Sequence, residues 1–259
     1  MLKGRRAIVT GSTSGIGAGY ARALAAEGCA VMLNGFGDPE EIERQRASMA
    51  KEFKVPVLFN GADLGNPEEC VQLVRETEKR LGGVDILINN AGIQYVAPVE
   101  EFPADRWDAI IAVNLSSAFH TIRAALPCMK ARKWGRLINT ASAHGLVASV
   151  NKVAYCTAKH GIVGLTKVVA LEAAQTGVTC NAICPGWVLT PLVQKQIEAI
   201  AQEQGISLKE AEHQLLMKEP TMRFTTIEQL GALAAFLCSE AASNITGAAI
   251  AADGGWTAQ

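Results

Sequence analysis

Short apolar runs alternate with helix-like segments along the whole chain, and this alternation constrains the fold more than any other feature. The apolar runs lie at 6–10, 30–34, 56–60, 84–90, 135–140, 178–184 and near 248–252. The segments with helical character lie at 15–28, 39–53, 66–81, 105–133, 152–174 and 226–239. Continuous apolar runs are typical of strands buried on both faces, as in parallel sheets. The pattern predicts an α/β fold, a doubly wound parallel sheet of seven strands with helices on both faces.

The domain organisation expected from this pattern is simple. The 259 residues fit one domain over 1–259, without a linker, an internal repeat or a low-complexity stretch. Residues 187–223 interrupt the alternation of strands and helices. They are polar and helical, and they lie between the sixth strand and the last helix. An insertion after the carboxyl end of a strand lies above the ligand crevice of such a sheet. We expect a helical lid there, and a solvated helical decoration is the alternative.

Composition and charge narrow the classes of partner. The chain has 24 Lys and Arg against 25 Asp and Glu, a formal charge of −1, whereas a binder of nucleic acid or anionic membranes needs a basic excess. No apolar run reaches the roughly 18 residues of a membrane span, and the first residues do not resemble a secretory signal. Seven cysteines, mostly inside apolar segments, indicate core thiols in a reducing cytoplasm. Cys180 and Cys184 share a predicted strand and lack partners at zinc spacing, so no metal site is expected.

A glycine-rich loop, TGSTSGIG (10–17), joins the first strand to an Ala-rich helix. The free backbone N–H groups and the dipole at a helix start hold a pyrophosphate, and glycines let the backbone approach it closely. The spacing is GxxxGxG rather than the commoner GxGxxG. The loop predicts a Rossmann-type dinucleotide site, with an ordinary strand–helix turn as the alternative. The expected cofactor contacts in it are Gly11, Thr13, Ser14, Gly15, Ile16 and Gly17.

The end of the second strand normally distinguishes NAD from NADP, through an acid for the ribose hydroxyl or a base for the 2′-phosphate. Gly35 occupies the usual acid position, no Lys or Arg follows in the turn, and Ser14 stands where a basic residue often helps. A 2′-phosphate would lack a counter-charge, so we predict NAD. We further expect Phe36 to pack on the adenosine, and Asp63 with its neighbour Leu64 to contact the adenine.

Tyr155 and Lys159 are four residues apart near the start of a predicted helix, so both lie on one face. Ser142 follows the carboxyl end of the fifth strand, and Asn114 lies inside a long helix. A pair of this type also occurs by chance on an exposed helix, but here it accompanies the glycine loop, NNAG (89–92) and Ser142. The combination predicts a catalytic group.

These residue types suit the oxidation of a secondary alcohol. A tyrosine with a pKa near 10 is a poor base at neutral pH, whereas an ammonium about 5 Å away contributes roughly 3 kcal/mol and lowers that pKa by about two. An oxidised nicotinamide acts in the same direction. Tyr155 then serves as general base. We expect Ser142 to hydrogen-bond the substrate oxygen, and Asn114 to hold a water that links Lys159 to solvent.

With these motifs, and with YCTAK (155–159) and PGWVLTP (185–191), the chain resembles the short-chain dehydrogenases/reductases over essentially its full length. The resemblance implies a Rossmann fold, a nicotinamide cofactor and the roles given above to Asn114, Ser142, Tyr155 and Lys159. Gly35 departs from the family's usual NAD pattern. The further cofactor contacts that the resemblance implies are Asn90, Ala91, Gly92, Tyr155, Lys159, Pro185, Val188 and Thr190.

Four polar side chains near the predicted site call for a ligand. They are Gln94, His144, Lys152 and Gln196. A cation, an imidazole and two amides that converge above the nicotinamide suit a small carboxylate, and Trp187 and Trp256 can wall a small apolar pocket. The alternatives are a solvated helix start for Lys152 and a surface position on the lid for Gln196.

Several segments resemble the bacterial D-3-hydroxybutyrate dehydrogenases: MLNGFGD, NNAGIQ, SAHGLVAS, CPGWVLTPLVQKQI and DGGWT. This resemblance implies NAD and a substrate carboxylate bound by Gln94, His144, Lys152 and Gln196. It also implies interconversion of (R)-3-hydroxybutyrate and acetoacetate, a reaction of ketone body metabolism. The alternatives are a 3-oxoacyl thioester reductase, which more often uses NADPH and a basic docking surface, and a non-catalytic dinucleotide sensor.

The predicted helix 152–174 also bears on assembly. GIVGLTKVVALEAA is apolar around most of its circumference, and Gly161 and Gly164 each cost up to about 1 kcal/mol inside a helix. Close packing against another helix offsets that cost, and a helix apolar on several faces is usually buried on several sides. We predict a two-fold interface here and, by resemblance, a homotetramer. Burial within one subunit is the alternative.

Overall fold

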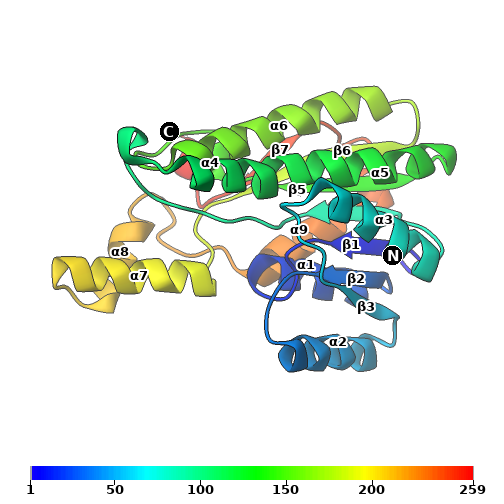
Figure 1. Cartoon of the computed structure of the whole chain (residues 1–259), viewed down its shortest axis with the longest axis horizontal. Helices are drawn as coiled ribbons and strands as arrows, with labels where there is room; N and C mark the ends of the chain where they lie inside the picture. Colours follow the sequence, from blue (N-terminus) through cyan, green and yellow to red (C-terminus); the bar gives the residue numbers. More distant parts are fainter. Residues whose placement is uncertain (1, 259) are drawn as a thin grey trace.

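The computed structural model describes residues 2–258, except for the side chain of Leu192. A parallel sheet of seven strands, in the order β3-β2-β1-β4-β5-β6-β7, forms its centre (Figure 1). The strands are β1 (Arg6–Val9), β2 (Ala30–Asn34), β3 (Val57–Asn60), β4 (Ile86–Asn89), β5 (Gly135–Thr140), β6 (Val178–Pro185) and β7 (Ala249–Ala252). The predicted fold class is confirmed. The strand order reverses between β1 and β4, which is where such sheets bind ligands.

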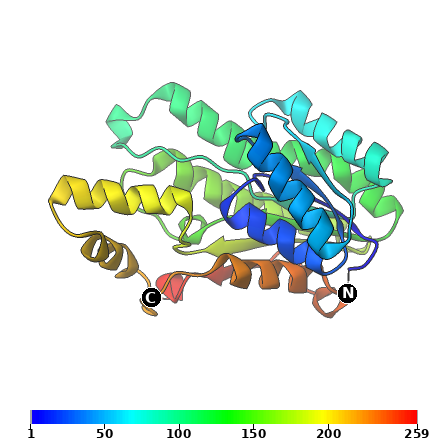
Figure 2. The same ribbon diagram turned by 90° about the horizontal axis from the view of Figure 1, so that it is seen from below.

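Helices cover both faces of the sheet (Figures 1 and 2). On one face lie α1 (Gly15–Ala26), α2 (Pro39–Phe53) and α9 (Ile227–Cys238). On the other lie α3 (Pro67–Leu81), α4 (Ala104–Ile111), α5 (Ser117–Ala131) and α6 (Val153–Ala173). The remaining helices, α7 (Pro191–Gln204) and α8 (Leu208–Leu216), belong to the predicted insertion 187–223.

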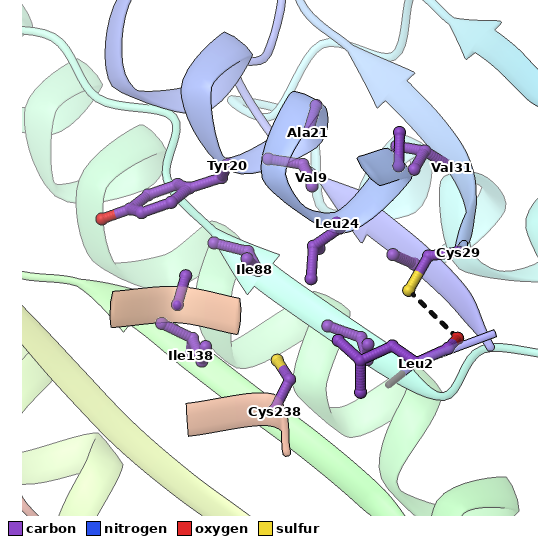
Figure 3. Close-up of a cluster of buried hydrophobic side chains, with 14 of the residues drawn as sticks. Leu2, Val9, Tyr20, Ala21, Leu24, Cys29, Val31, Ile88, Ile138 and Cys238 are labelled. Atoms are coloured by element: carbon purple, nitrogen blue, oxygen red, sulfur yellow. Dashed lines mark hydrogen bonds between the residues drawn. The ribbon is translucent and has the colours of Figure 1, made fainter. Parts of the chain in front are cut away.

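Each face of the sheet has its own apolar core. Along β1, Val9 packs towards α1 and α9, whereas its neighbour Ile8 packs towards α3, α5 and α6, because successive side chains point to opposite faces. Tyr20 and Leu24 of α1 are fully buried in the first core (Figure 3). The strands are therefore apolar throughout because both of their faces are covered.

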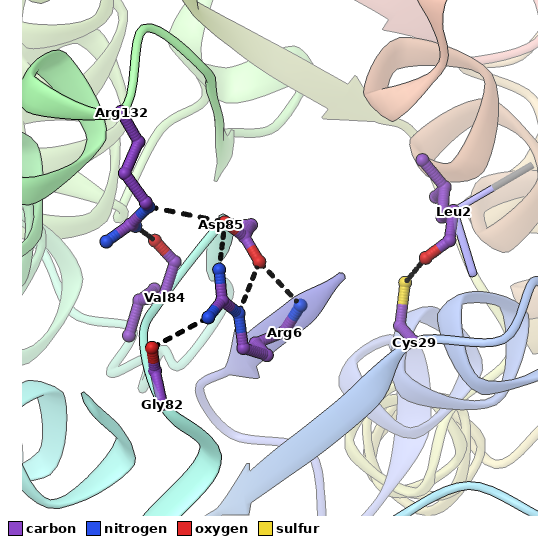
Figure 4. A network of polar contacts seen from close by, with 7 residues as sticks. All are labelled: Leu2, Arg6, Cys29, Gly82, Val84, Asp85 and Arg132. Carbon is purple, nitrogen blue, oxygen red and sulfur yellow. Dashed lines mark hydrogen bonds and ion pairs between the residues drawn. The ribbon is translucent and has the colours of Figure 1, made fainter. Parts of the chain in front are cut away.

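Polar contacts fasten the sheet at the amino ends of β1 and β4 (Figure 4). Buried Asp85 accepts from the Arg6 guanidinium at 2.6 and 2.8 Å and from the Arg6 backbone N–H at 3.0 Å. Arg132, just after α5, lies 3.6 Å from the same carboxylate and donates to the Val84 carbonyl. A buried charge with two cationic neighbours and several donors is well compensated. This edge is fixed, while the carboxyl edge remains available for a ligand.

The stretch Ala104–Ala131 qualifies the prediction that the chain lacks a membrane-length segment. Within the described residues it is the one helix that is long and apolar enough to cross a membrane, with a hydropathy of 1.3 in its most apolar window. A core helix passes the same test, and here the helix packs against α3 and the sheet. A π-helical turn at Ala112–Ser116 divides it into α4 and α5.

The 187–223 segment projects from the carboxyl ends of the strands (Figures 1 and 2). Thr190 caps α7, and a capping box of Ser207 with Glu210 starts α8. The segment was expected to be polar, but it encloses a small apolar core of its own. This core contains Trp187, Val193, Ile197, Ala211 and Leu216.

A buried carboxylate joins this segment to the sheet. Glu219, just after α8, accepts from the backbone N–H of Trp187 through Oε1, and Oε2 has no hydrogen-bond partner among the described residues. Burial, with a smaller contribution from the charge of Asp253, raises the pKa of Glu219 to about 7. The end of the segment, the end of β6 and the residue after β7 therefore meet at one acid.

Glu219→Gln is expected to stabilise the protein at pH 8. Because the folded-state pKa is raised, the native state binds a proton that the unfolded state has released, so stability falls as pH rises from about 4.5 to 7. The amide still accepts from Trp187 without a buried charge. Thermal unfolding at pH 4.5 and pH 8 should show a higher Tm for the variant mainly at pH 8. Exposed Glu203→Gln is the control, and a lower Tm of Glu219→Gln at pH 8 contradicts the assignment.

Candidate active site

A cleft of about 390 Å³ opens at the carboxyl ends of the central strands. Its size lies within the usual range of small-molecule sites. Most of the site residues predicted from the sequence line it: Gly11, Thr13, Ser14, Gly15, Ile16, Phe36, Asp63, Leu64, Asn90, Ala91, Gly92, Gln94, Ser142, Tyr155, Lys159, Pro185 and Thr190. Residues of the glycine loop and of the NNAG turn therefore share one cavity with Ser142, Tyr155 and Lys159, whereas Asn114 does not line it.

Gly17 explains the tightness of the glycine loop. A Cβ atom there would lie 2.1 Å from the Gly11 carbonyl oxygen and 2.5 Å from Asn90 Nδ2. The Asn90 amide in turn donates to the carbonyls of Thr10 and Gly11 at 3.0 and 3.1 Å. Gly17 thus packs the loop closed rather than lining the cleft. The N-cap Ser14 makes no side-chain cap bond, so the first N–H groups of α1 suit a pyrophosphate.

Gly35, at the end of β2, shows why the usual acid is missing. Its φ is +152°, and a Cβ would lie 2.6 Å from Thr13 Oγ1. The Thr13 hydroxyl donates instead to the Phe36 carbonyl at 2.9 Å. Among the cleft-lining residues that the structure describes, the only basic one is Lys159, and Asp63 is an acid of the same lining.

Asn34 is a cleft residue that the sequence analysis missed. It is buried at the end of β2, where Oδ1 accepts from the Gly11 N–H at 3.4 Å. Its Nδ2 donates to the carbonyls of Asn60 and Ala62 at 3.2 and 3.0 Å. One side chain thus joins the segments that follow β1, β2 and β3. A polar residue at the end of an otherwise apolar strand was the available signal.

Lys159 and Tyr155 come together as their spacing predicts. Lys159 is 3% exposed, its Nζ donates to the Thr140 carbonyl at 2.7 Å, and it lies 5.5 Å from the centre of the Tyr155 ring. Ser142 Oγ accepts from the His144 backbone N–H at 3.2 Å and lies 3.3 Å from His144 Nδ1. Strand β5 and helix α6 therefore supply these groups from neighbouring elements.

The pKa directions differ from the sequence expectation for Tyr155. Burial raises its pKa, and a hydrogen bond with the Ser142 side chain only opposes this. Burial also lowers the pKa of Lys159 to about 8. In the protein alone, loss of solvent outweighs the Ser142 hydrogen bond in its effect on the Tyr155 pKa. A base at this position needs a further positive charge beside it, which an oxidised nicotinamide supplies when bound.

Asn114 is buried in the π-helical turn Ala112–Ser116, inside the long helix where the sequence placed it. Its Oδ1 accepts from the Ile93 N–H at 2.8 Å, and its Nδ2 donates to the Ile93 carbonyl at 2.9 Å. The side chain thus fixes the loop that carries Asn90 and Gln94. Such π turns are frequent at functional sites.

Next to Ser142 and Tyr155, four of the predicted substrate residues form a group. The His144 ring lies 5.9 Å from that of Tyr155 and 5.0 Å from that of Trp256. Trp256 stacks on Trp187 at 5.9 Å, and Lys152 Nζ lies 5.1 Å from the Trp187 ring. Burial, then the charge of Lys152, lowers the pKa of His144 to about 3, so the imidazole is neutral. The group combines one cation, one neutral imidazole and two indoles.

The other predicted residues are placed less uniformly. Gln94 lines the cleft, and its Nε2 is buried without a hydrogen-bond partner among the described residues. Gln196 is half-buried on α7 and, within residues 2–258, makes no hydrogen bond with this group. Val188 does not line the cleft, because its side chain is buried in the core against α1 and α9. Only its backbone remains available for a cofactor.

Comparison with known proteins shows which proteins this chain is similar to. Residues 11–257 match a family model described as enoyl-(acyl carrier protein) reductase. The D-beta-hydroxybutyrate dehydrogenase of Cupriavidus necator is 58% identical and covers the whole of both chains, and that of Rhizobium meliloti is 53% identical over 98% of this chain and 99% of its own. The crystal structure of levodione reductase superposes with a TM-score of 0.93 at 32% identity, covering 100% of this chain and 99% of that one.

This chain belongs to the short-chain dehydrogenase/reductase family. The resemblance inferred from its motifs is confirmed, and the protein is an oxidoreductase with a Rossmann-type fold. The family binds a nicotinamide dinucleotide, and the cleft fits it through the glycine cradle and the open start of α1.

Replacement of Tyr155 by Phe tests the assignment of the general base. Loss of the phenolic oxygen is expected to reduce alcohol oxidation by about 10²–10⁴-fold, measured as NADH absorbance at 340 nm. Cofactor binding, followed by NADH fluorescence, should remain, since the ring stays in place. Tyr95→Phe, outside the cleft lining, is the matched control and should retain activity. Full turnover by Tyr155→Phe would reject the assignment.

Proposed function

We propose that this protein interconverts (R)-3-hydroxybutyrate and acetoacetate with NAD, using Tyr155 as general base. The observation that carries the proposal is the group of Lys152, His144, Trp187 and Trp256 beside Ser142 and Tyr155. It offers a cation and a small apolar space next to the catalytic hydroxyls. The two full-length relatives named D-beta-hydroxybutyrate dehydrogenase support the same substrate.

In the proposed mechanism, Ser142 donates to the substrate oxygen and Tyr155 accepts the hydroxyl proton. An oxidised nicotinamide bound in the cleft would supply the hydride acceptor, so the alcohol would lose its hydroxyl proton to Tyr155 and a hydride from the carbinol carbon. Lys159, held by the Thr140 carbonyl, stabilises the tyrosinate from within the protein. Asn114 keeps the neighbouring loop in register through Ile93.

The same side chains explain a preference for a short carboxylate. The substrate carboxylate pairs with Lys152, and the free Nε2 of Gln94 supplies a further donor. Neutral His144 donates or accepts without repelling Lys152. The stacked indoles of Trp187 and Trp256 bound the space available to the alkyl end. We include Gln196 in this set as a residue that approaches when the 187–223 segment closes as a lid.

The proposed cofactor is NAD rather than NADP. A 2′-phosphate carries nearly two negative charges at pH 7 and needs a cation. The only basic residue of the described cleft lining is Lys159, which lies beside Tyr155, and Asp63 adds a negative charge to the lining. Exposed Phe36 is available to pack on the adenosine.

Rates with both 3-hydroxybutyrate enantiomers and both cofactors test this proposal. We expect the (R) enantiomer with NAD to exceed every other combination by at least about 100-fold in kcat/KM, which corresponds to roughly 2.7 kcal/mol. Reduction of acetoacetyl-CoA with NADPH, measured in parallel, tests the alternative that the protein is a thioester reductase. Equal rates for the enantiomers, or faster reduction of the thioester, would reject the proposal, and no turnover would favour a non-catalytic sensor.

We propose a single domain over 1–259 that works in the cytoplasm as a homotetramer. One sheet runs from β3 to β7, and the seven cysteines are free thiols that suit a reducing compartment. A Cβ on Gly161 would touch Leu115 at 2.8 Å, so that glycine serves packing within the subunit. Gly164 instead faces open space, beside Val168 and Leu171, which are 53% and 79% exposed. This face of α6 supports a two-fold interface.

Size-exclusion chromatography with light scattering tests the assembly. The wild type should have about four times the chain mass of 27.4 kDa. Val168→Asp with Leu171→Asp should lower that mass, because buried unpaired carboxylates oppose association. Leu208→Asp, at an exposed leucine of α8, is the control. A monomeric wild type contradicts the interface.

A further inference from the structure

Lys218 lies where the 187–223 segment returns to the body of the protein, between α8 and buried Glu219. Its Nζ donates to Ser149 Oγ at 3.3 Å and lies 5.2 Å from the centre of the Trp256 ring. The sequence analysis did not select it, because it is one of several lysines in a polar helical stretch. The fold brings it to the edge of the group around His144.

A short series of side chains connects Lys218 with the catalytic serine. Ser149 Oγ lies 2.9 Å from His144 Nε2, and His144 Nδ1 lies 3.3 Å from Ser142 Oγ. Both imidazole nitrogens are therefore engaged, one towards the catalytic serine and one towards the residue that meets Lys218. The ammonium is two side chains away from Ser142.

Two ammonium groups face the same stacked indoles. Lys152 lies over Trp187 and Lys218 over Trp256, and the indole planes are 22° apart. Burial, then the charge of Lys218, lowers the pKa of Lys152 to about 8, while Cys156 acts in the opposite direction. The like charges are close enough to repel each other.

No carboxylate compensates these two cations. Across residues 2–258, neither Lys152 nor Lys218 forms an ion pair with an acidic side chain. The nearest acid along the chain, Glu219, directs its carboxylate to the Trp187 backbone and towards Asp253. Two ammonium groups without an acidic partner, beside a neutral imidazole, fit an anion that arrives as a ligand.

We propose that Lys218 is a second cation of the substrate-carboxylate site, carried by the 187–223 segment and used together with Lys152. This inference rests on the proposed function for the identity of the ligand as a short hydroxy- or oxo-carboxylate. The negative charge of the ligand is inferred from the two lysines alone. Because Lys152 belongs to the body of the protein and Lys218 to the segment, a carboxylate bound by both ties the two parts together.

Calorimetric titration of the NAD⁺-loaded protein with acetate and malonate tests this without requiring turnover. Malonate, with two carboxylates, should bind more tightly than acetate to the wild type. Lys218→Met should weaken malonate about tenfold and remove most of its advantage over acetate. Lys218→Arg should retain the advantage, and Lys209→Met, an exposed lysine of α8, should match the wild type.

Equal malonate affinities in Lys218→Met and Lys209→Met, or no carboxylate binding by the wild type, would overturn the proposal. Ser149→Ala distinguishes a direct effect of the Lys218 charge from an effect transmitted through Ser149 to His144. It removes the Ser149 hydroxyl but keeps the Lys218 ammonium. If Ser149→Ala weakens malonate as much as Lys218→Met does, the effect passes through His144 and the proposal is wrong. A preserved malonate preference in Ser149→Ala supports direct recognition.

Turnover gives a second readout. With NADH, Lys218→Met should lower the ratio of kcat/KM for acetoacetate to that for its neutral methyl ester about tenfold, whereas Lys209→Met should not change the ratio. Malonate binding that depends on Lys218 without turnover of acetoacetate would refute the proposed function and leave the anion site intact. Turnover with an unchanged ratio would refute the role of Lys218 alone.

Discussion

A buried ammonium on a carbonyl oxygen organises the active site. Lys159 has almost no exposed surface, so its charge requires a strong acceptor, and the Thr140 carbonyl at the end of β5 provides one at 2.7 Å. The contact fixes α6 against β5 and thereby places Tyr155 beside Ser142. A Cβ on Gly145 would lie 2.7 Å from the Lys159 carbonyl, so this glycine permits the close approach of α6.

The two ends of the strands differ in role: polar contacts at the amino ends stabilise the sheet, whereas the carboxyl ends carry the active site. At the amino edge, Asp85 with Arg6 and Arg132 forms a compensated charge network. At the carboxyl edge, polar groups are left without partners among the described residues, including Gln94 Nε2 and Thr140 Oγ1. Unpaired buried groups lower stability unless a ligand satisfies them. Both of these residues line the cleft, where a bound ligand can satisfy them.

The 187–223 segment and the substrate group belong together. Trp187 starts the segment, Lys218 and Glu219 end it, and Trp256 comes from the chain terminus. A displacement of the segment would therefore change the surroundings of His144 and Lys152 directly. Because the segment is anchored through Glu219, a carboxyl with a raised pKa, its anchoring depends on pH.

The sequence by itself determined the doubly wound fold, because strands buried on both faces must be apolar throughout, and helical spacing places Tyr155 and Lys159 on one face. It also selected the glycine loop and most of the cleft. Only the tertiary structure decided that Asn114 binds Ile93, that Val188 lies in the core and that Lys218 reaches Ser149. Those contacts join residues far apart in the chain or depend on a local turn geometry, so the periodicity of apolar residues in the sequence does not predict them. The directions of the pKa values likewise depend on burial, which a pattern of residue types does not measure.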